Sequence, residues 1–463
     1  MKKNILTIDD LFEIPTAAIY RPEKYIPATS VSIDSRVVQM DSIFIAIKGE
    51  KFDGHDFVHE AVKKGASTII INEKRLSEFN DIPIPIMTVR DTVLALGEIA
   101  KTWRNKLDTK IIGITGSAGK TTTKEMLAAI LSSKFKINKT LGNNNNHIGV
   151  PLTLLSTNDQ HEYLILEFGT NHFGEIAYTA KIAQPDYALI TNIGNSHLEY
   201  LKNKKGVLTE KAALFESVSA KNGCVFINND DVMLNKTMLN YSKRITFGFS
   251  SAADVKGTIK SFNDEGKPII EITYKDKKFD QQLNLYGEQN AQNFLSAAAV
   301  ALKLGLNKKE ISDGLSKFKP IEKRLNVRKF KKIILIDDTY NANPESMKYA
   351  IELMCKLKNY DNRIIILGDM LELGENSSKL HIELAKVIKR NKITKAFLIG
   401  NQMMNLNLEL KKMDVESSHF VDRKCMEKTL AENNFKGSVV LIKGSRGMKM
   451  EEFVKIIEDK AHE

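Results

Sequence analysis

Short apolar runs alternate with stretches of helical spacing along most of the chain. Residues 110–115 ("KIIGIT"), 162–168 ("EYLILEF") and 223–228 ("GCVFIN") are such runs. Residues 89–107 instead place their apolar side chains three or four positions apart. Strands that are buried on both faces read as continuous apolar runs, whereas amphipathic helices show the wider spacing. The alternation predicts an α/β protein with mostly parallel sheets.

The chain divides into segments with different patterns. Its 463 residues correspond to about three domains of roughly 150 residues each. Residues 30–86 carry short strands and turns, and residues 255–285 read as an antiparallel insert. After Pro320 the pattern restarts, with runs such as "KIILID" and "SVVLIKG" each leading toward a helix. This repeated βα alternation predicts a separate doubly wound domain in the C-terminal part.

Composition narrows the class of protein. A hydrophobic share of 42% excludes wholesale disorder, and Lys plus Arg exceed Asp plus Glu by 68 to 57. The basic residues are scattered, so we favour a lysine-rich surface, although an anionic substrate or nucleic acid would also suit the charge. Cys224, Cys355 and Cys425 are far apart, which favours a reducing compartment and neither disulfides nor a zinc site. We find no signal peptide and no long apolar run, and expect a cytoplasmic protein without a membrane span.

The strongest motif is "GITGSAGKTTTKEM", residues 113–126, between a predicted strand and a predicted helix. In such loops the backbone N–H groups bind phosphate, the lysine reaches the terminal phosphates and the hydroxyl holds Mg²⁺. The general form G-x-x-x-x-G-K-[ST] is not met, because Ile114 stands at its first glycine. The shorter form uses Gly116, Gly119, Lys120 and Thr121. It predicts an ATP site.

Polar residues at other strand ends are candidates for the same site. Glu167 ends an apolar run, where a carboxylate can bind Mg²⁺ or cap a helix. His197 follows another strand end, and its residue type alone leaves a capping or core role open. The four asparagines at 143–146 form either a loop of amide groups or a composition bias. The segment "DDTYNANPESM" at 337–347 lies at a strand-to-helix junction, where α/β domains hold small ligands. In it, Asn343 and Pro344 fit an N-cap and a first helical turn.

Together these segments resemble the Mur ligase family of peptidoglycan synthesis. The resemblance rests on the shortened loop with "GKTTT", the T-x-G-N-x-N-N-x-I-G-x-P pattern at 140–151, Glu167 and His197. Four further segments resemble the branch of the family that uses D-alanyl-D-alanine: "DDTYNANPESM", "GDMLELGE" (368–375), "KGSRGMKMEE" (443–452) and "DSRVVQMDSIFIAIKGEKFDGHDFV" (34–58). The resemblance implies three domains: a UDP-binding domain at 1–88, an ATP-binding domain at 89–325 and a Rossmann-like domain at 326–463.

The resemblance also implies a reaction. A carboxylate of UDP-N-acetylmuramoyl-tripeptide would attack the γ-phosphate of ATP to give an acyl phosphate. The amine of D-alanyl-D-alanine would then displace phosphate and form an amide. Charge neutralisation, from lysine and two Mg²⁺ ions, is what such phosphoryl transfer needs most. No nucleic acid partner is implied, and we expect a monomer.

By the same resemblance, individual residues acquire roles. The catalytic residues would be Lys120, Glu167, His197 and Lys211. The Mg²⁺ ligands would be Thr121, Glu167, His197 and Lys211. Lys211 stands where several family members carry a carbamylated lysine, and an ordinary surface lysine is the alternative. ATP would be bound by Gly116, Ser117, Ala118, Gly119, Lys120, Thr121, Thr122, Asn290, Asn293, Arg324, Asp338, Tyr340 and Asn341. The other substrates would be bound by Ser35, Arg36, Lys48, Asn143, Asn145, Asn146, Ser445 and Arg446.

Four other classes of protein share part of this pattern. A switch GTPase would need a guanine-specificity motif such as N-K-x-D, which we do not find in a suitable position. A nucleic-acid-binding ATPase stays open because of the positive charge. Within the family, the alternatives are the ligase that adds the third residue, which lacks the "DDTYNANP" form, and a folylpolyglutamate-type ligase, which lacks a domain like residues 1–88. The sequence leaves open whether diaminopimelate or lysine is the third residue of the tripeptide.

Overall fold

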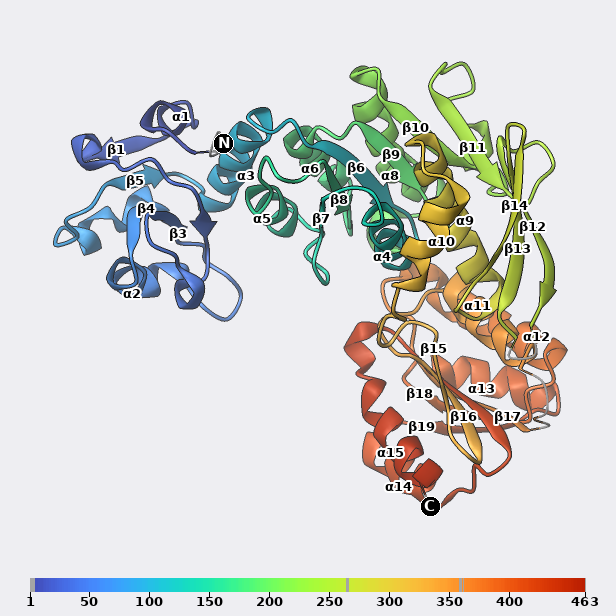
Figure 1. The fold of residues 1–463 in the computed structure, drawn as a ribbon. Coiled ribbons are helices and arrows are strands. Elements are labelled where there is room, and N and C mark those ends of the chain that lie inside the picture. Colours follow the sequence, from blue (N-terminus) through green and yellow to red (C-terminus); the bar gives the residue numbers. More distant parts are fainter. Residues whose placement is uncertain (1–4, 264–265, 358–359, 361, 463) are drawn as a thin grey trace.

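Three β-sheets follow one another along the chain in the computed structural model (Figure 1). The structure describes residues 5–462 except 264, 265, 358, 359 and 361. The first sheet lies at one end of the molecule, the second in the middle and the third at the other end. The predicted α/β class with mostly parallel sheets is therefore confirmed. Among the described residues, no helix is long and apolar enough to cross a membrane.

The N-terminal sheet has the strand order β1-β5-β4-β3-β2, and only β1 runs antiparallel to its neighbour. Its inner strands are buried, as continuous apolar runs require. The strands are β1 (Ala18–Tyr20), β2 (Val31–Ser32), β3 (Ser42–Ile45), β4 (Ala66–Asn72) and β5 (Ile86–Val89), with helices α1 (Ile8–Phe12) and α2 (Val58–Lys63).

The central sheet has nine strands in the order β14-β13-β12-β11-β10-β9-β6-β8-β7. Its strands are β6 (Lys110–Thr115), β7 (Ile137–Lys139), β8 (Tyr163–Glu167), β9 (Tyr187–Ile190), β10 (Cys224–Asn228), β11 (Arg244–Gly248), β12 (Val255–Phe262), β13 (Pro268–Tyr274) and β14 (Lys277–Gln282). Strands β12 to β14 pair antiparallel with one another, as expected for 255–285. The chain returns to opposite sides of β6 with β8 and β9, so the carboxyl end of β6 is a topological switch point, where ligands bind in such sheets.

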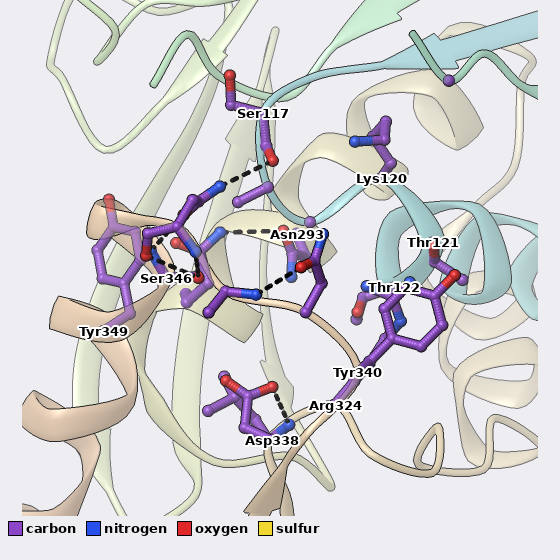
Figure 2. A pocket seen from close by; sticks show the side chains of 18 of the residues that line it. Ser117, Lys120, Thr121, Thr122, Asn293, Arg324, Asp338, Tyr340, Ser346 and Tyr349 are labelled. Carbon is purple, nitrogen blue, oxygen red and sulfur yellow. Dashed lines mark hydrogen bonds between the residues drawn. The ribbon is translucent and has the colours of Figure 1, made fainter. Parts of the chain in front are cut away.

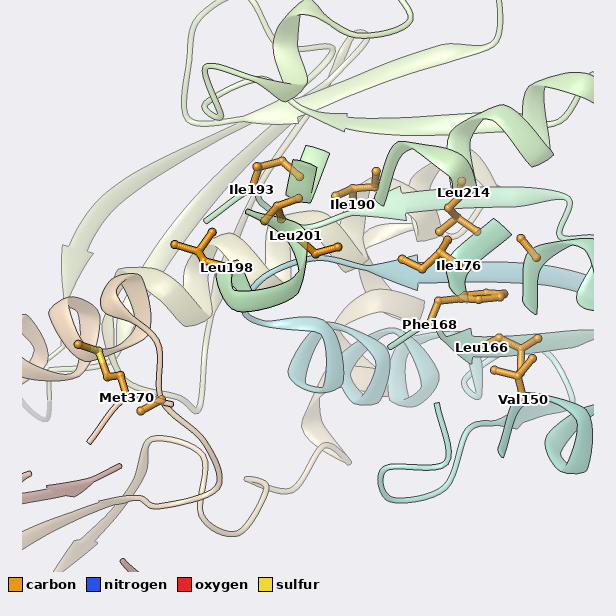
Figure 3. Close-up of a cluster of buried hydrophobic side chains, with 14 of the residues drawn as sticks. Val150, Leu166, Phe168, Ile176, Ile190, Ile193, Leu198, Leu201, Leu214 and Met370 are labelled. Carbon is orange, nitrogen blue, oxygen red and sulfur yellow. The ribbon is translucent and has the colours of Figure 1, made fainter. Parts of the chain in front are cut away.

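Helices cover both faces of the central sheet. They are α3 (Thr92–Asn105), α4 (Lys120–Leu131), α5 (Gly149–Leu155), α6 (Glu175–Ala183), α7 (Leu198–Leu201), α8 (Lys204–Ala220), α9 (Gly287–Lys303) and α10 (Lys308–Ser316). Figure 3 shows one layer of this core, in which Val150, Leu166, Phe168, Ile176 and Leu214 lie between strands and helices. The same apolar cluster continues to Met370 of the C-terminal domain, so the two domains share packing.

The C-terminal sheet has the order β15-β16-β20-β17-β18-β19, and all neighbours are parallel except β15 and β16. Its strands are β15 (Asn326–Lys329), β16 (Ile333–Asp338), β17 (Asn362–Gly368), β18 (Lys395–Ile399), β19 (Glu416–Phe420) and β20 (Ser438–Lys443). Its helices are α11 (Pro344–Met354), α12 (Ser377–Arg390), α13 (Met403–Lys412), α14 (Arg423–Glu432) and α15 (Glu451–His462). Residues 339–343 join β16 to α11, and Asn343 in this segment contacts the central domain.

Candidate active site

The glycine loop connects β6 to α4, and its geometry depends on two glycines. A Cβ atom on Gly116 would lie 1.9 Å from Thr191 Oγ1, and Gly119 adopts a φ of +81°, which side chains disfavour. Gly119 immediately precedes α4, and the Thr123 N–H already donates to its carbonyl oxygen at 2.9 Å. The N–H groups of the first helical turn therefore lie at the edge of the loop, where a helix N-terminus favours an anion.

A cavity of about 300 Å³ lies over this loop, between the central and C-terminal domains (Figure 2). The central domain contributes residues from the loop, from the asparagine segment and from α9, and the C-terminal domain contributes the β16–α11 junction. Of the predicted residues, the cavity is lined by Ser117, Ala118, Gly119, Lys120, Thr121, Thr122, Asn143, Asn145, Glu167, His197, Asn290, Asn293, Arg324, Asp338, Tyr340 and Asn341. We name this the nucleotide cavity.

Lys120 lies in this cavity, where its ammonium donates to the Gly116 carbonyl oxygen at 2.6 Å. Burial lowers the pKa of Lys120 below its ordinary value, Glu167 opposes that change, and Arg324 adds to it. The residues that line the cavity include the cations Lys120, Arg324 and Lys443 and the carboxylates Glu167 and Asp338, so positive side chains outnumber negative ones. Such a charge balance suits a polyanion such as a nucleotide triphosphate.

Glu167 ends β8 and is 2% exposed. Its Oε1 atom accepts hydrogen bonds from Thr121 Oγ1 at 3.1 Å and from Asn145 Nδ2 at 2.9 Å. Its Oε2 atom is buried and accepts none from the described residues, while the ammonium of Lys124 lies 3.7 Å away. A buried carboxylate oxygen beside a threonine hydroxyl is the oxygen donor set that Mg²⁺ prefers.

The described residues include no group of three or more His, Cys, Asp or Glu side chains placed to hold a metal. Mg²⁺ sites in nucleotide enzymes commonly use one or two protein carboxylates and take their other ligands from phosphate oxygens and water. Glu167 and Thr121 fit that pattern. The residues present are therefore compatible with Mg²⁺ bound together with a nucleotide.

His197 immediately precedes α7, and its Nδ1 atom lies 2.6 Å from Oε2 of Glu372 in the C-terminal domain. Burial is the largest influence on His197 and lowers its pKa, the hydrogen bond to Glu372 opposes that change, and the charge of Lys211 adds to it. The hydrogen bond from His197 lowers the pKa of Glu372. The pair thus joins an imidazole of the central domain to an ionised carboxylate of the C-terminal domain.

Lys211 lies on α8 and is 1% exposed, so it is no surface lysine. Burial, and then the positive charge of Lys120, hold its pKa well below the ordinary value. Its neighbour Glu210 accepts hydrogen bonds from the backbone N–H groups of Gly174 and Ile176, which fixes this turn of the helix. Lys211 is not among the residues that line the nucleotide cavity.

The C-terminal wall of the cavity is built by the β16–α11 junction. Asp338 accepts hydrogen bonds from the Lys443 ammonium at 2.5 Å and from the Leu325 N–H at 3.0 Å. The guanidinium of Arg324 lies 3.8 Å from the ring centre of Tyr340, and Figure 2 shows this stack beside Thr122. The stack gives the cavity a flat cationic and aromatic surface, which suits a nucleotide base or phosphate.

Asn343 links the two walls. Its Oδ1 accepts from the Ser346 N–H at 2.8 Å, and its Nδ2 donates to the Ser117 carbonyl oxygen at 3.2 Å. The first contact caps α11, with Pro344 as its first residue, as predicted. The second joins that cap directly to the glycine loop.

A second cavity of about 150 Å³ adjoins the first, and we name it the acceptor cavity. Lys120, His197 and Asn341 line both cavities. Ser445 and Arg446 line only the second, together with Glu372. The hydroxyl of Ser445 is already occupied, since it accepts from the Leu371 N–H at 2.8 Å, whereas Arg446 is exposed and pairs with Glu451.

Four predicted substrate residues lie outside both cavities. Ser35 donates to Glu60, exposed Arg36 pairs with Asp34, and Lys48 is exposed, all in the N-terminal domain. Asn146 lies just before α5, where its Oδ1 accepts hydrogen bonds from the N–H groups of residues 148 and 149. Lys443 and Glu372 are site residues that the sequence reading did not single out. The position of Lys443 could have indicated a site residue, because this lysine ends a strand that is fully buried.

The chain belongs to the Mur ligase family. The Mur ligase family catalytic domain matches residues 27–104, the Mur ligase middle domain matches residues 114–301, and the Mur ligase glutamate ligase domain matches residues 323–446. The UDP-N-acetylmuramoyl-tripeptide–D-alanyl-D-alanine ligase of Bacillus subtilis (strain 168) is 33% identical over 459 residues, which is 97% of each chain. The ligase of the same name from Haemophilus influenzae is 35% identical over 95% of each chain.

Solved structures of MurF ligases resemble this chain over nearly its whole length. A crystal structure of MurF from Acinetobacter baumannii superposes with a TM-score of 0.87 at 30% identity and covers 99% of both chains. The MurF ligase of Thermotoga maritima in complex with ADP has a TM-score of 0.81 at 30% identity and covers 94% of this chain and 98% of its own. The likeness therefore extends over all three sheets.

Proposed function

We propose that this chain is an ATP-dependent ligase that joins D-alanyl-D-alanine to UDP-N-acetylmuramoyl-tripeptide through an acyl phosphate, giving the pentapeptide precursor of peptidoglycan. The observation that carries the proposal is the likeness over nearly the whole chain to two ligases that bear this name. The neighbouring cavities add support, because this reaction needs a nucleotide site and an acceptor site that meet at one point.

In this proposal ATP occupies the nucleotide cavity. Its phosphates lie over residues 116–122, with Lys120 at the terminal phosphates. Arg324, Asp338, Tyr340 and Asn341 contact the nucleotide from the C-terminal wall, and Asn290 and Asn293 contact it from α9. Thr121 and Glu167 would hold one Mg²⁺, and His197 and Lys211 would serve a second. Mg²⁺ supplies charge neutralisation to the transferring phosphoryl group.

Lys211 is proposed to carry a carbamate. Formation of a carbamate requires a neutral amine that attacks carbon dioxide, and burial together with Lys120 favours the neutral amine. The product carries an anionic oxygen donor, which suits Mg²⁺. The buried Lys211 side chain would thereby become a part of the metal site.

The other substrates would bind on either side of the reaction centre. We propose that D-alanyl-D-alanine enters the acceptor cavity, where Arg446 can pair with its carboxylate and Ser445 shapes the wall. The uridine diphosphate group would bind the N-terminal domain at Ser35, Arg36 and Lys48. The peptide of that substrate would pass near Asn143 and Asn145, and Asn146 would position this segment through its hydrogen bonds to the backbone at the start of α5.

The division of labour follows the proposed domains: residues 1–88 bind the UDP-substrate, residues 89–325 bind ATP, and residues 326–463 complete the nucleotide and acceptor sites. We further propose that the protein acts in the cytoplasm, because its nucleotide-linked substrate and ATP are cytoplasmic metabolites, and that it acts as a monomer.

One assay tests the function. Release of phosphate from ATP is measured with UDP-N-acetylmuramoyl-tripeptide, with and without D-alanyl-D-alanine, and the pentapeptide product is followed by mass spectrometry. We expect product and sustained phosphate release only with both substrates. Turnover with UDP-N-acetylmuramoyl-dipeptide and a single amino acid, in place of the tripeptide and D-alanyl-D-alanine, would point to the ligase that adds the third residue. Salt-dependent retention on DNA without ligation would favour a nucleic-acid-binding ATPase.

A further inference from the structure

We propose that Glu372 of the C-terminal domain is a positioning residue for the reaction, which orients the imidazole of His197 across the domain interface. The inference rests on the proposed function for its place in the reaction. The contact itself does not depend on that function, because the structure shows a side chain of the central domain held by a carboxylate of the C-terminal domain. His197 lines both the nucleotide and the acceptor cavity, so its orientation acts where the two meet.

The hydrogen bond between the two side chains determines which nitrogen of His197 carries a proton. Oε2 of Glu372 lies 2.6 Å from Nδ1 of His197, and a carboxylate can only accept. Nδ1 must therefore carry the hydrogen, and in the neutral ring Nε2 keeps a lone pair. No residue that the structure describes forms a hydrogen bond with Nε2, which leaves that lone pair available to the cavities.

The loop that presents Glu372 is itself held against His197. The backbone carbonyl of Glu372 accepts a hydrogen bond from the Glu199 N–H at 3.1 Å. Both Glu372 and His197 adopt left-handed backbone conformations, with φ of +62° and +54°. A Cβ atom on Gly374 would lie only 3.1 Å from the Cα atom of Glu199. These contacts hold the backbone of Glu372 beside His197, and the Glu372 side chain reaches the imidazole while 39% of it stays exposed.

A second carboxylate at the same interface provides a comparison. Glu345 accepts hydrogen bonds from the Asn195 backbone N–H at 2.9 Å and from the Asn195 Nδ2 at 3.0 Å, and pairs with Lys204. Glu345 thus docks the segment that precedes His197 but does not contact the imidazole. If Glu372 served only to dock the domains, loss of either carboxylate would have the same effects.

The consequence is a coupling between docking and orientation. The central domain supplies the imidazole, and only the docked C-terminal domain supplies its acceptor. His197 therefore adopts its fixed orientation when the nucleotide cavity has both of its walls. A residue that orients a metal-binding or catalytic imidazole through a hydrogen bond typically contributes about 10- to 100-fold to activity or metal affinity in other enzymes.

The test compares Glu372→Ala, Glu372→Gln, Glu345→Ala and His197→Ala. We expect Glu372→Ala to lower kcat about 10- to 100-fold with little change in the KM for ATP. Glu372→Gln should retain most of the rate, because its amide oxygen still accepts from Nδ1. The double variant Glu372→Ala with His197→Ala should be no slower than His197→Ala, because both changes remove one interaction. Wild-type kcat in Glu372→Ala, or additive losses in the double variant, would overturn the proposal.

A measurement without turnover separates orientation from docking. Nuclear magnetic resonance of isotope-labelled histidine, with His197→Ala to assign the signal, reports which ring nitrogen carries the proton. We expect the Nδ1–H form in the wild type, in Glu372→Gln and in Glu345→Ala, and a mixture of forms in Glu372→Ala. An unchanged Nδ1–H form in Glu372→Ala would overturn the inference. This readout needs no substrate, so it decides the inference even if the ligation assay of the wild type fails.

Discussion

Lys120 and Lys211 both have lowered pKa values, but their surroundings differ. Lys120 borders a cavity and donates to the carbonyl oxygen of Gly116, so its ammonium can exchange that partner for a phosphate oxygen. Lys211 is 1% exposed inside the domain, and its strongest charged neighbour is Lys120 itself. The first lysine is suited to remain charged at the surface of a cavity, and the second to become neutral and to react.

Lys120→Ala should lower ligation by about 100-fold or more, because removal of a group that stabilises developing charge in a transition state typically has an effect of that size. The fold should persist, because the side chain faces a cavity and not the core. Phosphate release measures the first expectation, and thermal unfolding followed by circular dichroism measures the second. Full activity at saturating substrates would contradict the assignment of this cavity to ATP.

Lys211→Ala should reduce activity strongly, because it removes the proposed carbamate. Bicarbonate should not restore the rate, since no amine is left to react, whereas acetate should restore part of it by occupying the vacated site with a carboxylate. Initial rates with each additive measure this. The matched control is Lys205→Ala on the same helix, an exposed lysine that should be replaceable without loss. A Lys211→Ala enzyme with the rate of the wild type would rule out any metal role for this residue.

At the scale of elements, the sequence pattern and the structure differ mainly at sheet edges. Strands β7, β15 and β19 were not expected from the sequence, and each lies at an edge of its sheet. Their residues are partly exposed, so none of them is a continuous apolar run. The inner strands β6, β8, β16 and β20 are buried at nearly every position and were predicted for that reason.

Helix α11 provides an element-scale prediction. Asn343→Ala should lower the free energy of unfolding by about 1 kcal/mol, the typical contribution of an N-cap. It should also lower activity, because the same side chain donates to the Ser117 carbonyl oxygen of the glycine loop. Chemical denaturation and phosphate release measure the two effects.

The control for this variant is Asp422→Ala, which removes the side chain that caps α14 through the Cys425 N–H. That cap lies outside both cavities, so its loss should destabilise the protein to a similar extent without slowing ligation. Equal activity losses in the two capping variants would show that stability alone explains the effect of Asn343.

At the scale of the whole molecule, two of the three domains are in contact around the cavities and the third lies apart from them. The central and C-terminal domains already meet through Asn343, Glu345 and Glu372. The N-terminal domain extends away from the C-terminal domain in Figure 1, and its candidate residues line neither cavity. An acyl phosphate needs protection from water, which a closing domain can provide.

We therefore expect the protein to become more compact when an ATP analogue and the UDP-linked tripeptide bind together. We expect the N-terminal domain to move toward the reaction centre, and we expect Pro320 with the charged segment after it to act as a hinge between the other two domains. Small-angle scattering measures the radius of gyration with each ligand alone and with both. A radius that both ligands leave unchanged would count against closure as the gating step.

The sequence by itself determined the parts of this protein that depend on neighbouring residues. The buried strands, the glycine loop before α4 and the cap of α11 were all evident, because apolar runs, the conformational freedom of Gly119 and the capping by Asn343 act over a few positions. The local pattern left Glu167 as either a Mg²⁺ ligand or a helix cap and left the role of His197 open, and the resemblance to the family then gave both residues their expected roles.

Only the tertiary structure decided which groups meet across the domains. Glu372 and His197 are 175 positions apart, and Lys443 and Asp338 are 105 apart, so neither pair has a local signature. Asn146 looked equivalent to Asn145, but the turn of the chain directs one side chain to α5 and the other to Glu167. Such contacts depend on how loops with unusual backbone angles and whole domains dock, which is set by packing over the entire molecule and not by the order of residues within a segment.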